Sequence, residues 1–260
     1  ESWVEGAVEF EVEAVGGNLI CEEVAGPTTN DCKASVNFVS SQDLNVKFVR
    51  LGFKDKNGIS HLPSTKDAKE LRKRLLATYP VANVSASYGV ITLPDVNEGV
   101  EVIDVLTRLI KLKRSEGCGD TCSTQYYAFT NDTAPNFGYW DNGVWNAIGG
   151  IANGVPSTTK VSLGQKVDAI NTYGYNRHGH EIGHALGRHH AVAGCGSVAD
   201  AGAPVFPNIN QVDGRDVGTI GPLSPEQDVI FGFDSYMGRI IDPEKNFAMM
   251  SYCRPAGQMR

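Results

Sequence analysis

Five of the chain's six histidines lie within thirteen residues, in the segment His178-Gly-His-Glu-Ile-Gly-His-Ala-Leu-Gly-Arg-His-His190. On a helix, His180 and His184 are four positions apart, so their side chains leave one face only about 40° apart around the axis. Two imidazoles placed in this way can bind the same metal ion. The segment therefore predicts a helix that carries metal ligands on one face.

A glycine follows the second of these histidines by three residues. Gly187 can adopt a positive φ, which ends a helix and turns the chain sharply, so we expect it to bring His190 back to the same ion. Three neutral imidazoles fill three tetrahedral positions of Zn²⁺ and leave the fourth to water, as in catalytic rather than structural zinc sites. We therefore predict His180, His184 and His190 as the ligands of one catalytic zinc ion.

A glutamate follows the first predicted ligand. Glu181 is about 100° from His180 around the helix axis, which places it beside the ion rather than among its ligands. A base in that position can take a proton from the water that the ion polarises and later give it to a leaving amine. The competing interpretation of Glu181 is a solvated carboxylate on the helix surface.

The segment matches the metzincin pattern HExxHxxGxxH at every fixed position, as HEIGHALGRHH. Metzincins also have a methionine-containing turn below the metal, and Ala248-Met-Met-Ser-Tyr-Cys253 resembles it, with Met250 as the turn methionine and Met249 as the alternative in register. The resemblance implies that Tyr252 approaches the metal or the developing oxyanion; a buried tyrosine with its hydroxyl satisfied is the alternative. The chain thus resembles metzincin zinc metallopeptidases, most closely the reprolysin-like bacterial enzymes.

The resemblance covers residues 43–260 and implies the α/β (α+β) fold of a metzincin-type zincin. Such a fold has a twisted mixed sheet with two backing helices, an active-site helix and an irregular C-terminal subdomain. Metzincins bind peptide antiparallel to an edge strand, and the Gly-rich segment 149–154 resembles that strand; a simple hairpin turn is the alternative. The residues expected to line the substrate are Gly150, Ile151, Ala152 and Asn153.

Hydrophobic patterning independently favours alternating strands and helices from about residue 43 onward. The expected strands are 45–51, 84–88, 124–129 and 158–163, and the expected helices are 64–78 and 100–112. Residues 1–42 instead contain short apolar–polar alternations at 8–12 and 34–39 and an apolar run at 18–21. They predict a small β-rich N-terminal segment, such as part of a β-sandwich, preceding the catalytic domain.

Six cysteines, an even number, suit an oxidising compartment. Proximity in sequence favours the pairs Cys21–Cys32 and Cys118–Cys122. The third pair, Cys195–Cys253, is a hypothesis because both members flank the presumed metal site, and reprolysin-like enzymes also carry cysteines after the third histidine and after the Met turn. Structural zinc held by cysteines is the competing interpretation.

The charge and composition of the chain limit the kinds of molecule that we expect it to bind. The net charge is −7 and the basic residues form no long run, so nucleic acid is an unexpected partner. No stretch approaches the roughly 18 apolar residues that span a bilayer. The opening Glu1-Ser-Trp lacks the layout of a signal peptide, so we expect that an export signal has been removed. We also expect a secreted monomer that acts on protein or peptide substrates. Calcium could bind a set of acidic residues, although solvated acids are the alternative. These are Asp200, Asp213, Asp216 and Asp228.

The remaining histidines, His61, His178 and His189, are interpreted as polar surface residues or as core residues with satisfied hydrogen bonds. Two other functions stay open beside a secreted zinc endopeptidase. One is a non-catalytic zinc-containing binding or adhesion module, which the β-rich start and acidic charge favour. The other is a zinc amidohydrolase that acts on a non-peptide amide.

Overall fold

The chain divides into two compact units, Glu1–Gln42 and Asp43–Arg260. In the computed structural model the first unit contains β1 (Gly6–Glu11), which pairs antiparallel with β2 (Lys33–Phe38). The predicted run at 18–21 lies outside the described residues. Beyond β1 and β2, the structure describes residues 42–168, 173–190, 209–212, 215–218, 232–234, 238–241 and 248–251.

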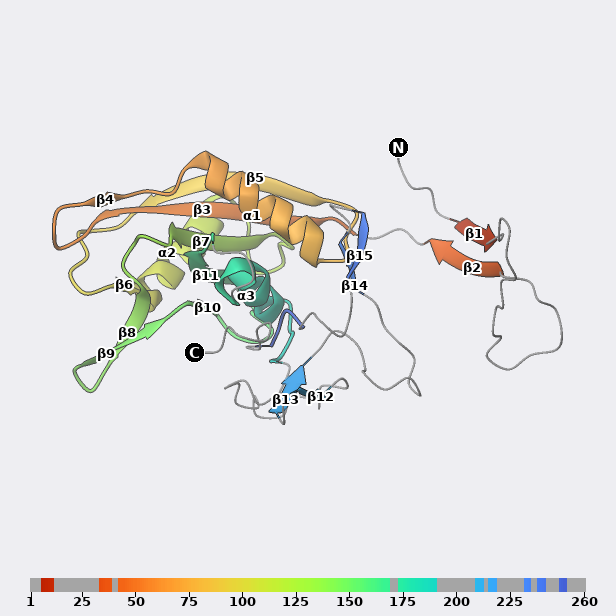
Figure 1. Cartoon of the computed structure of the whole chain (residues 1–260). Helices are drawn as coiled ribbons and strands as arrows, with labels where there is room; N and C mark the ends of the chain where they lie inside the picture. The colour runs from red at the N-terminus through yellow and green to blue at the C-terminus, as the bar shows by residue number, and fades with distance from the viewer. Residues whose placement is uncertain are drawn as a thin grey trace. The chain divides into compact units, whose positions relative to one another are not determined.

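The second unit is built on a twisted, mixed sheet of six strands (Figure 1). The strands follow the order β10-β11-β7-β3-β4, and β5 also pairs with β3. Strands β3, β5, β7 and β11 are mutually parallel, whereas β4 and β10 run antiparallel to their neighbours. The six strands are β3 (Leu44–Lys54), β4 (Ser60–His61), β5 (Val84–Thr92), β7 (Gln125–Asn131), β10 (Gly150–Ala152) and β11 (Val161–Lys166).

Three α-helices and one 3₁₀-helix lie in the described part of this unit. They are α1 (Thr65–Thr78), α2 (Val102–Ser115), η1 (Tyr173–Asn176) and α3 (Arg177–Ala185). Helix α1 begins where the sequence predicts, because Ser64 and Asp67 form a capping box: the Ser64 hydroxyl accepts from the Asp67 N–H, and the Asp67 carboxylate accepts from the Ser64 N–H. Helix α2 starts at Val102 and continues three residues beyond the predicted end.

Helices cover both faces of the sheet. Strand β7 is buried on both sides, and its side chains alternate between two separate cores. Tyr127 and Phe129 belong to the core that includes residues of α1 and α3, among them Ile182. Tyr126 and Ala128 belong to the core that includes residues of α2. The unit therefore has three layers, with α1 and α3 on one face of the sheet and α2 on the other.

The predicted mixed α/β class is confirmed, and each strand predicted after residue 43 is present within a few residues of its expected bounds. The sequence analysis did not predict the hairpin in which β8 (Phe137–Asp141) and β9 (Val144–Ile148) pair antiparallel; β6 (Val100–Glu101) adds to β8. Asn142 and Gly143 turn the hairpin with φ of 49° and 80°. Two further hairpins are β12 (Ile209–Val212) with β13 (Arg215–Gly218), and β14 (Gly232–Asp234) with β15 (Arg239–Ile241). None of the described helices has the length and apolarity needed to cross a membrane.

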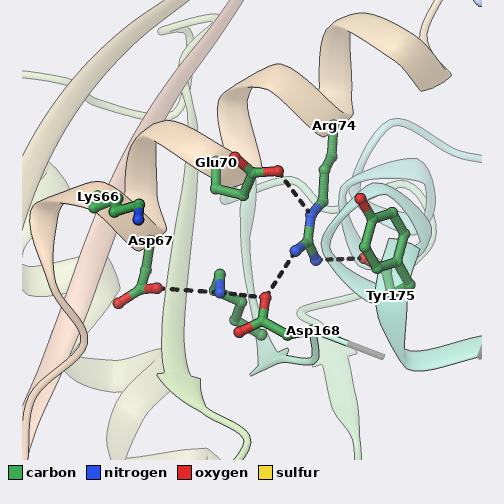
Figure 2. Close-up of a pocket in the computed structure, with 7 residues that line it drawn as sticks. Lys66, Asp67, Glu70, Arg74, Asp168 and Tyr175 are labelled. Carbon is green, nitrogen blue, oxygen red and sulfur yellow. Dashed lines mark hydrogen bonds and ion pairs between the residues drawn. The ribbon is translucent and has the colours of Figure 1, made fainter. Parts of the chain in front are cut away.

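A cluster of charged residues joins α1 to the end of β11 and to the segment that leads into α3 (Figure 2). Together with Tyr175, its members are Lys66, Asp67, Glu70, Arg74, Lys166 and Asp168. Its centre is Arg74, which is 6% exposed and donates to the carbonyl oxygens of Val167 and Tyr175 at 2.8 and 3.1 Å. Its guanidinium also pairs with Asp168 at 2.9 Å and lies 3.8 Å from the centre of the Tyr175 ring. The opposite charges of the cluster satisfy one another, so it fastens α1 to the approach of α3.

We expect Arg74→Met to lower the free energy of unfolding by about 2 kcal/mol. Two partly buried carbonyls lose a charged donor, while Asp168, being 58% exposed, returns to water at little cost. Arg108→Met is the matched control, because Arg108 makes an exposed pair with Asp104 on α2, and such pairs contribute below about 0.5 kcal/mol. Urea unfolding measures both variants; equal losses would contradict the assigned role of Arg74.

Candidate metal centre

The structure brings His180, His184 and His190 together. Nε2 of His184 lies 3.0 Å from Nε2 of His180 and 3.0 Å from Nε2 of His190. One nitrogen from each ring lies within 4.8 Å of the other two. The first two residues come from α3, and the third from the chain just after it. The three imidazoles are therefore close enough to bind one metal ion.

The turn after α3 has the geometry that the sequence predicted for Gly187, whose φ is +94°. The Arg188 N–H donates to the carbonyl of Gly183, and the Gly187 N–H donates to that of His184, both at 2.8 Å. These two hydrogen bonds form a Schellman motif, in which glycine is favoured because its left-handed conformation has no Cβ penalty. The motif reverses the chain within three residues and so returns His190 to the helix.

Two main-chain carbonyls fix the orientation of the first two imidazoles. Nδ1 of His180 lies 2.9 Å from the carbonyl oxygen of Met249, and Nδ1 of His184 lies 2.7 Å from that of Arg188. A carbonyl can only accept, so each Nδ1 carries the proton and each Nε2 of the neutral ring presents a lone pair. Two lone pairs 3.0 Å apart repel, and a cation shared between them removes that repulsion.

Burial keeps the His180 ring neutral. His180 is only 1% exposed, and burial lowers the pKa of its imidazole to about 3, against the opposing effect of the hydrogen bond to Met249. A neutral imidazole is the form that coordinates a metal. The donor set therefore fits a cation of the kind that imidazole nitrogens prefer.

Glu181 lies beside this trio and against the edge of the sheet. It is 5% exposed, and burial raises the pKa of its carboxyl to about 8, which the Arg177 guanidinium opposes. A Cβ added at Gly150 would lie 2.9 Å from Oε1 of Glu181, so only glycine allows β10 to come this close. The competing interpretation of Glu181 as a solvated surface carboxylate is wrong, because the residue is buried.

Strand β10 contains three of the four residues that the sequence assigned to substrate binding. Ile151 pairs with Leu163 of β11, and Asn153, just beyond the strand, donates from its N–H to the carbonyl of Val161 at 3.0 Å. On the preceding side, the Gln165 N–H donates to the carbonyl of Gly149 at 3.0 Å. Odd-numbered residues thus bond to β11, so the N–H and C=O groups of Gly150 and Ala152 point to the opposite side. In the described part of the chain no strand pairs with that side.

Met250 lies under α3. It is buried, and a Cβ added at Gly183 would lie 2.7 Å from its sulfur. Its neighbour Met249 has a similar relation to Gly179, at 2.8 Å, and supplies the carbonyl that orients His180. The two methionines therefore contact successive turns of the helix through two glycines. Tyr252 lies outside the described residues, as do Cys195 and Cys253.

The other histidines do not join the trio. His178 is buried, its ring hydrogen-bonds the backbone of Leu71 on α1, and burial lowers its pKa to about 3. His61 lies 3.0 Å from Asp55 and stacks on Phe53. Both are hydrogen-bonded core residues, as predicted. His189 is partly buried and lies beside His190 in sequence.

Of the predicted disulfides, the bond between Cys118 and Cys122 is present. Cys21 and Cys32 lie outside the described residues. For the calcium prediction, the structure describes only Asp216, by its backbone in β13. Asp200, Asp213 and Asp228 lie outside.

Sequence reasoning missed Arg177, the first residue of α3. Its side chain is 9% exposed and lies one helical turn before Glu181. The spacing of four residues was a signal that the two side chains share a face. The carbonyl partners of His180 and His184 were also missed, and that of His180 is 69 residues away in sequence.

Comparison with known protein families, with curated proteins and with solved structures finds no match to this chain.

We expect Gly187→Ala to weaken binding of Zn²⁺, used as the probe ion, about tenfold. Alanine at a φ of +94° carries strain of about 1–3 kcal/mol, and moving the turn to relieve it displaces His190. Gly117→Ala is the control, since Gly117 ends α2 with a φ of +75° and has open space around it. Competition titration with a chelator gives the affinities. Wild-type affinity in both variants would exclude a role for the turn in placing the third ligand.

Proposed function

We propose that this chain is a secreted, zinc-dependent endopeptidase of the metzincin kind. The observation that carries the proposal is the convergence of three imidazole nitrogens beside a buried glutamate and a sheet edge with which no described strand pairs. Nitrogens bound about 2.1 Å from a tetrahedral zinc lie roughly 3.4 Å apart, close to the 3.0 Å separations here. Of the metals that accept imidazole, zinc most commonly has three protein ligands and an open fourth position in hydrolases.

The edge of β10 offers a means of holding a peptide. Gly150 and Ala152 direct their main-chain groups away from β11, so an extended substrate can add to the sheet as a further strand. Gly150 also contacts Glu181, which puts a peptide bond held at this edge next to the carboxylate. The binding contacts are to the backbone, which suits a peptidase that acts on many sequences.

Zinc held by the three imidazoles would supply a Lewis acid that polarises the scissile carbonyl and acidifies the attacking water. Glu181 takes a proton from that water on its carboxylate as the oxygen bonds to the carbonyl carbon. When the C–N bond breaks, the same carboxyl group gives the proton to the leaving amine. Met249 and Arg188 hold His180 and His184 in the tautomer that presents Nε2.

The Cys118–Cys122 disulfide supports the proposed location, because disulfides persist in oxidising compartments. The resemblance in HEIGHALGRHH and in the methionines that lie below α3 supports the proposed kind of peptidase.

Glu181→Gln is expected to retain one equivalent of zinc and to lose about 10³-fold in kcat/KM on a denatured protein substrate. Glutamine keeps the size of the side chain and cannot take the proton. Glu101→Gln is the control, because Glu101 is exposed at the start of α2. Metal analysis and a quenched-peptide library provide the two measurements.

The same experiment separates the alternatives. Cleavage by Glu181→Gln at the wild-type rate would contradict the role of Glu181. A wild-type protein that binds one zinc and cleaves nothing in the library would instead indicate the zinc-containing binding module.

A further inference from the structure

Arg177 passes between the sheet and the start of α3. A Cβ added at Gly164, on β11, would lie 3.2 Å from Cδ and 3.3 Å from Cγ of Arg177. A Cβ added at Gly149, just before β10, would lie 2.4 Å from the guanidinium carbon and 2.6 Å from two of its nitrogens. The stem of the arginine therefore crosses Gly164, and its head lies on Gly149. A side chain at Gly149 would collide with the guanidinium, whereas one at Gly164 would press on the arginine stem and collide with the Tyr127 hydroxyl, 2.7 Å from its Cβ.

Gly150, the first residue of β10, has the same relation to Glu181. Gly150 lies against the carboxylate as Gly149 lies against the guanidinium, with a Cβ at 2.9 Å from Oε1. Arg177 and Glu181 are one turn apart on α3, so they share a face of the helix. Two successive glycines thus rest on two successive side chains of that face. Arg177 and Glu181 therefore both limit how closely this edge of the sheet approaches α3.

The flat shape of the guanidinium suits this place. A planar head can lie in the narrow space over Gly149, whereas a lysine ammonium is compact, strongly hydrated and tetrahedral. In the plane of the sheet, β10 is already held by the hydrogen bond from Gln165 to the carbonyl of Gly149. The remaining freedom is movement toward or away from α3, and Arg177 restricts that movement by contact.

We propose that Arg177 is a positioning residue that sets the separation between the peptide-binding edge of β10 and the Glu181 carboxylate. The inference rests on the proposed function, since that separation matters when a peptide lies on β10.

Arg177→Met tests the proposal in the zinc-loaded full chain. We expect one equivalent of zinc to remain, kcat on a library peptide to fall about 10- to 100-fold, and KM to change less than about threefold, since small misplacements cost rate. Arg108→Met, the same change at an exposed helix site, should leave kcat and KM unchanged. Arg177→Lys should recover part of the kcat lost in Arg177→Met. If Arg177→Met does not fold, Arg177→Lys takes its place, with a smaller loss expected.

A double-mutant cycle gives a readout that does not need cleavage. Gly149→Ala alone should speed amide hydrogen exchange in residues 149–152 about tenfold, because its Cβ collides with the guanidinium. In an Arg177→Ala background, which removes the collision, Gly149→Ala should add nothing further. Equal effects of Gly149→Ala in both backgrounds, or wild-type kcat in folded Arg177→Met, would overturn the proposal. A wild type that cleaves nothing would overturn the proposed function, and the exchange cycle would still decide whether Arg177 positions β10.

Discussion

The candidate metal centre depends on the Nε2 lone pairs of His180 and His184, which face each other with the two nitrogens 3.0 Å apart. Their orientation is imposed by main-chain carbonyls, because a carbonyl oxygen requires a proton on Nδ1 and leaves Nε2 as an acceptor. Burial of His180 disfavours relief by protonation, since it lowers the pKa of the ring to about 3. A bound cation relieves the repulsion between the two lone pairs without protonation of either ring. His190 offers such a cation a third nitrogen.

The rest of the unit holds that arrangement in place from several directions. Ile182 anchors α3 in the core that also contains Tyr127 and Phe129, while Met249 and Met250 contact its other side through Gly179 and Gly183. The charged cluster around Arg74 ties α1 to the residues just before α3. Helix α3 is short, so its position comes from these contacts rather than from its own helical propensity. The site is therefore a product of the packing between layers.

Local signals in the sequence predicted the parts of the structure that local geometry determines. The spacing of His180 and His184, the turn at Gly187 and the cap at Ser64 each follow from a few neighbouring residues. The hairpin at Asn142-Gly143 was predictable in the same way, since this dipeptide favours a type I′ turn, and it was missed. The contacts of Met249 with His180 and of Gly149 with Arg177 join distant segments, and no local pattern contains them. They became visible only once the strands and helices were placed.

The coordination of a bound zinc ion tests the central claim most directly. X-ray absorption spectroscopy at the zinc edge, on protein loaded with one equivalent, gives the number and type of ligands. We predict three imidazole nitrogens and one further oxygen at about 2.0–2.1 Å, which is the signature of an open catalytic site. A sulfur ligand at about 2.3 Å, or a fourth protein nitrogen closing the site, would contradict it.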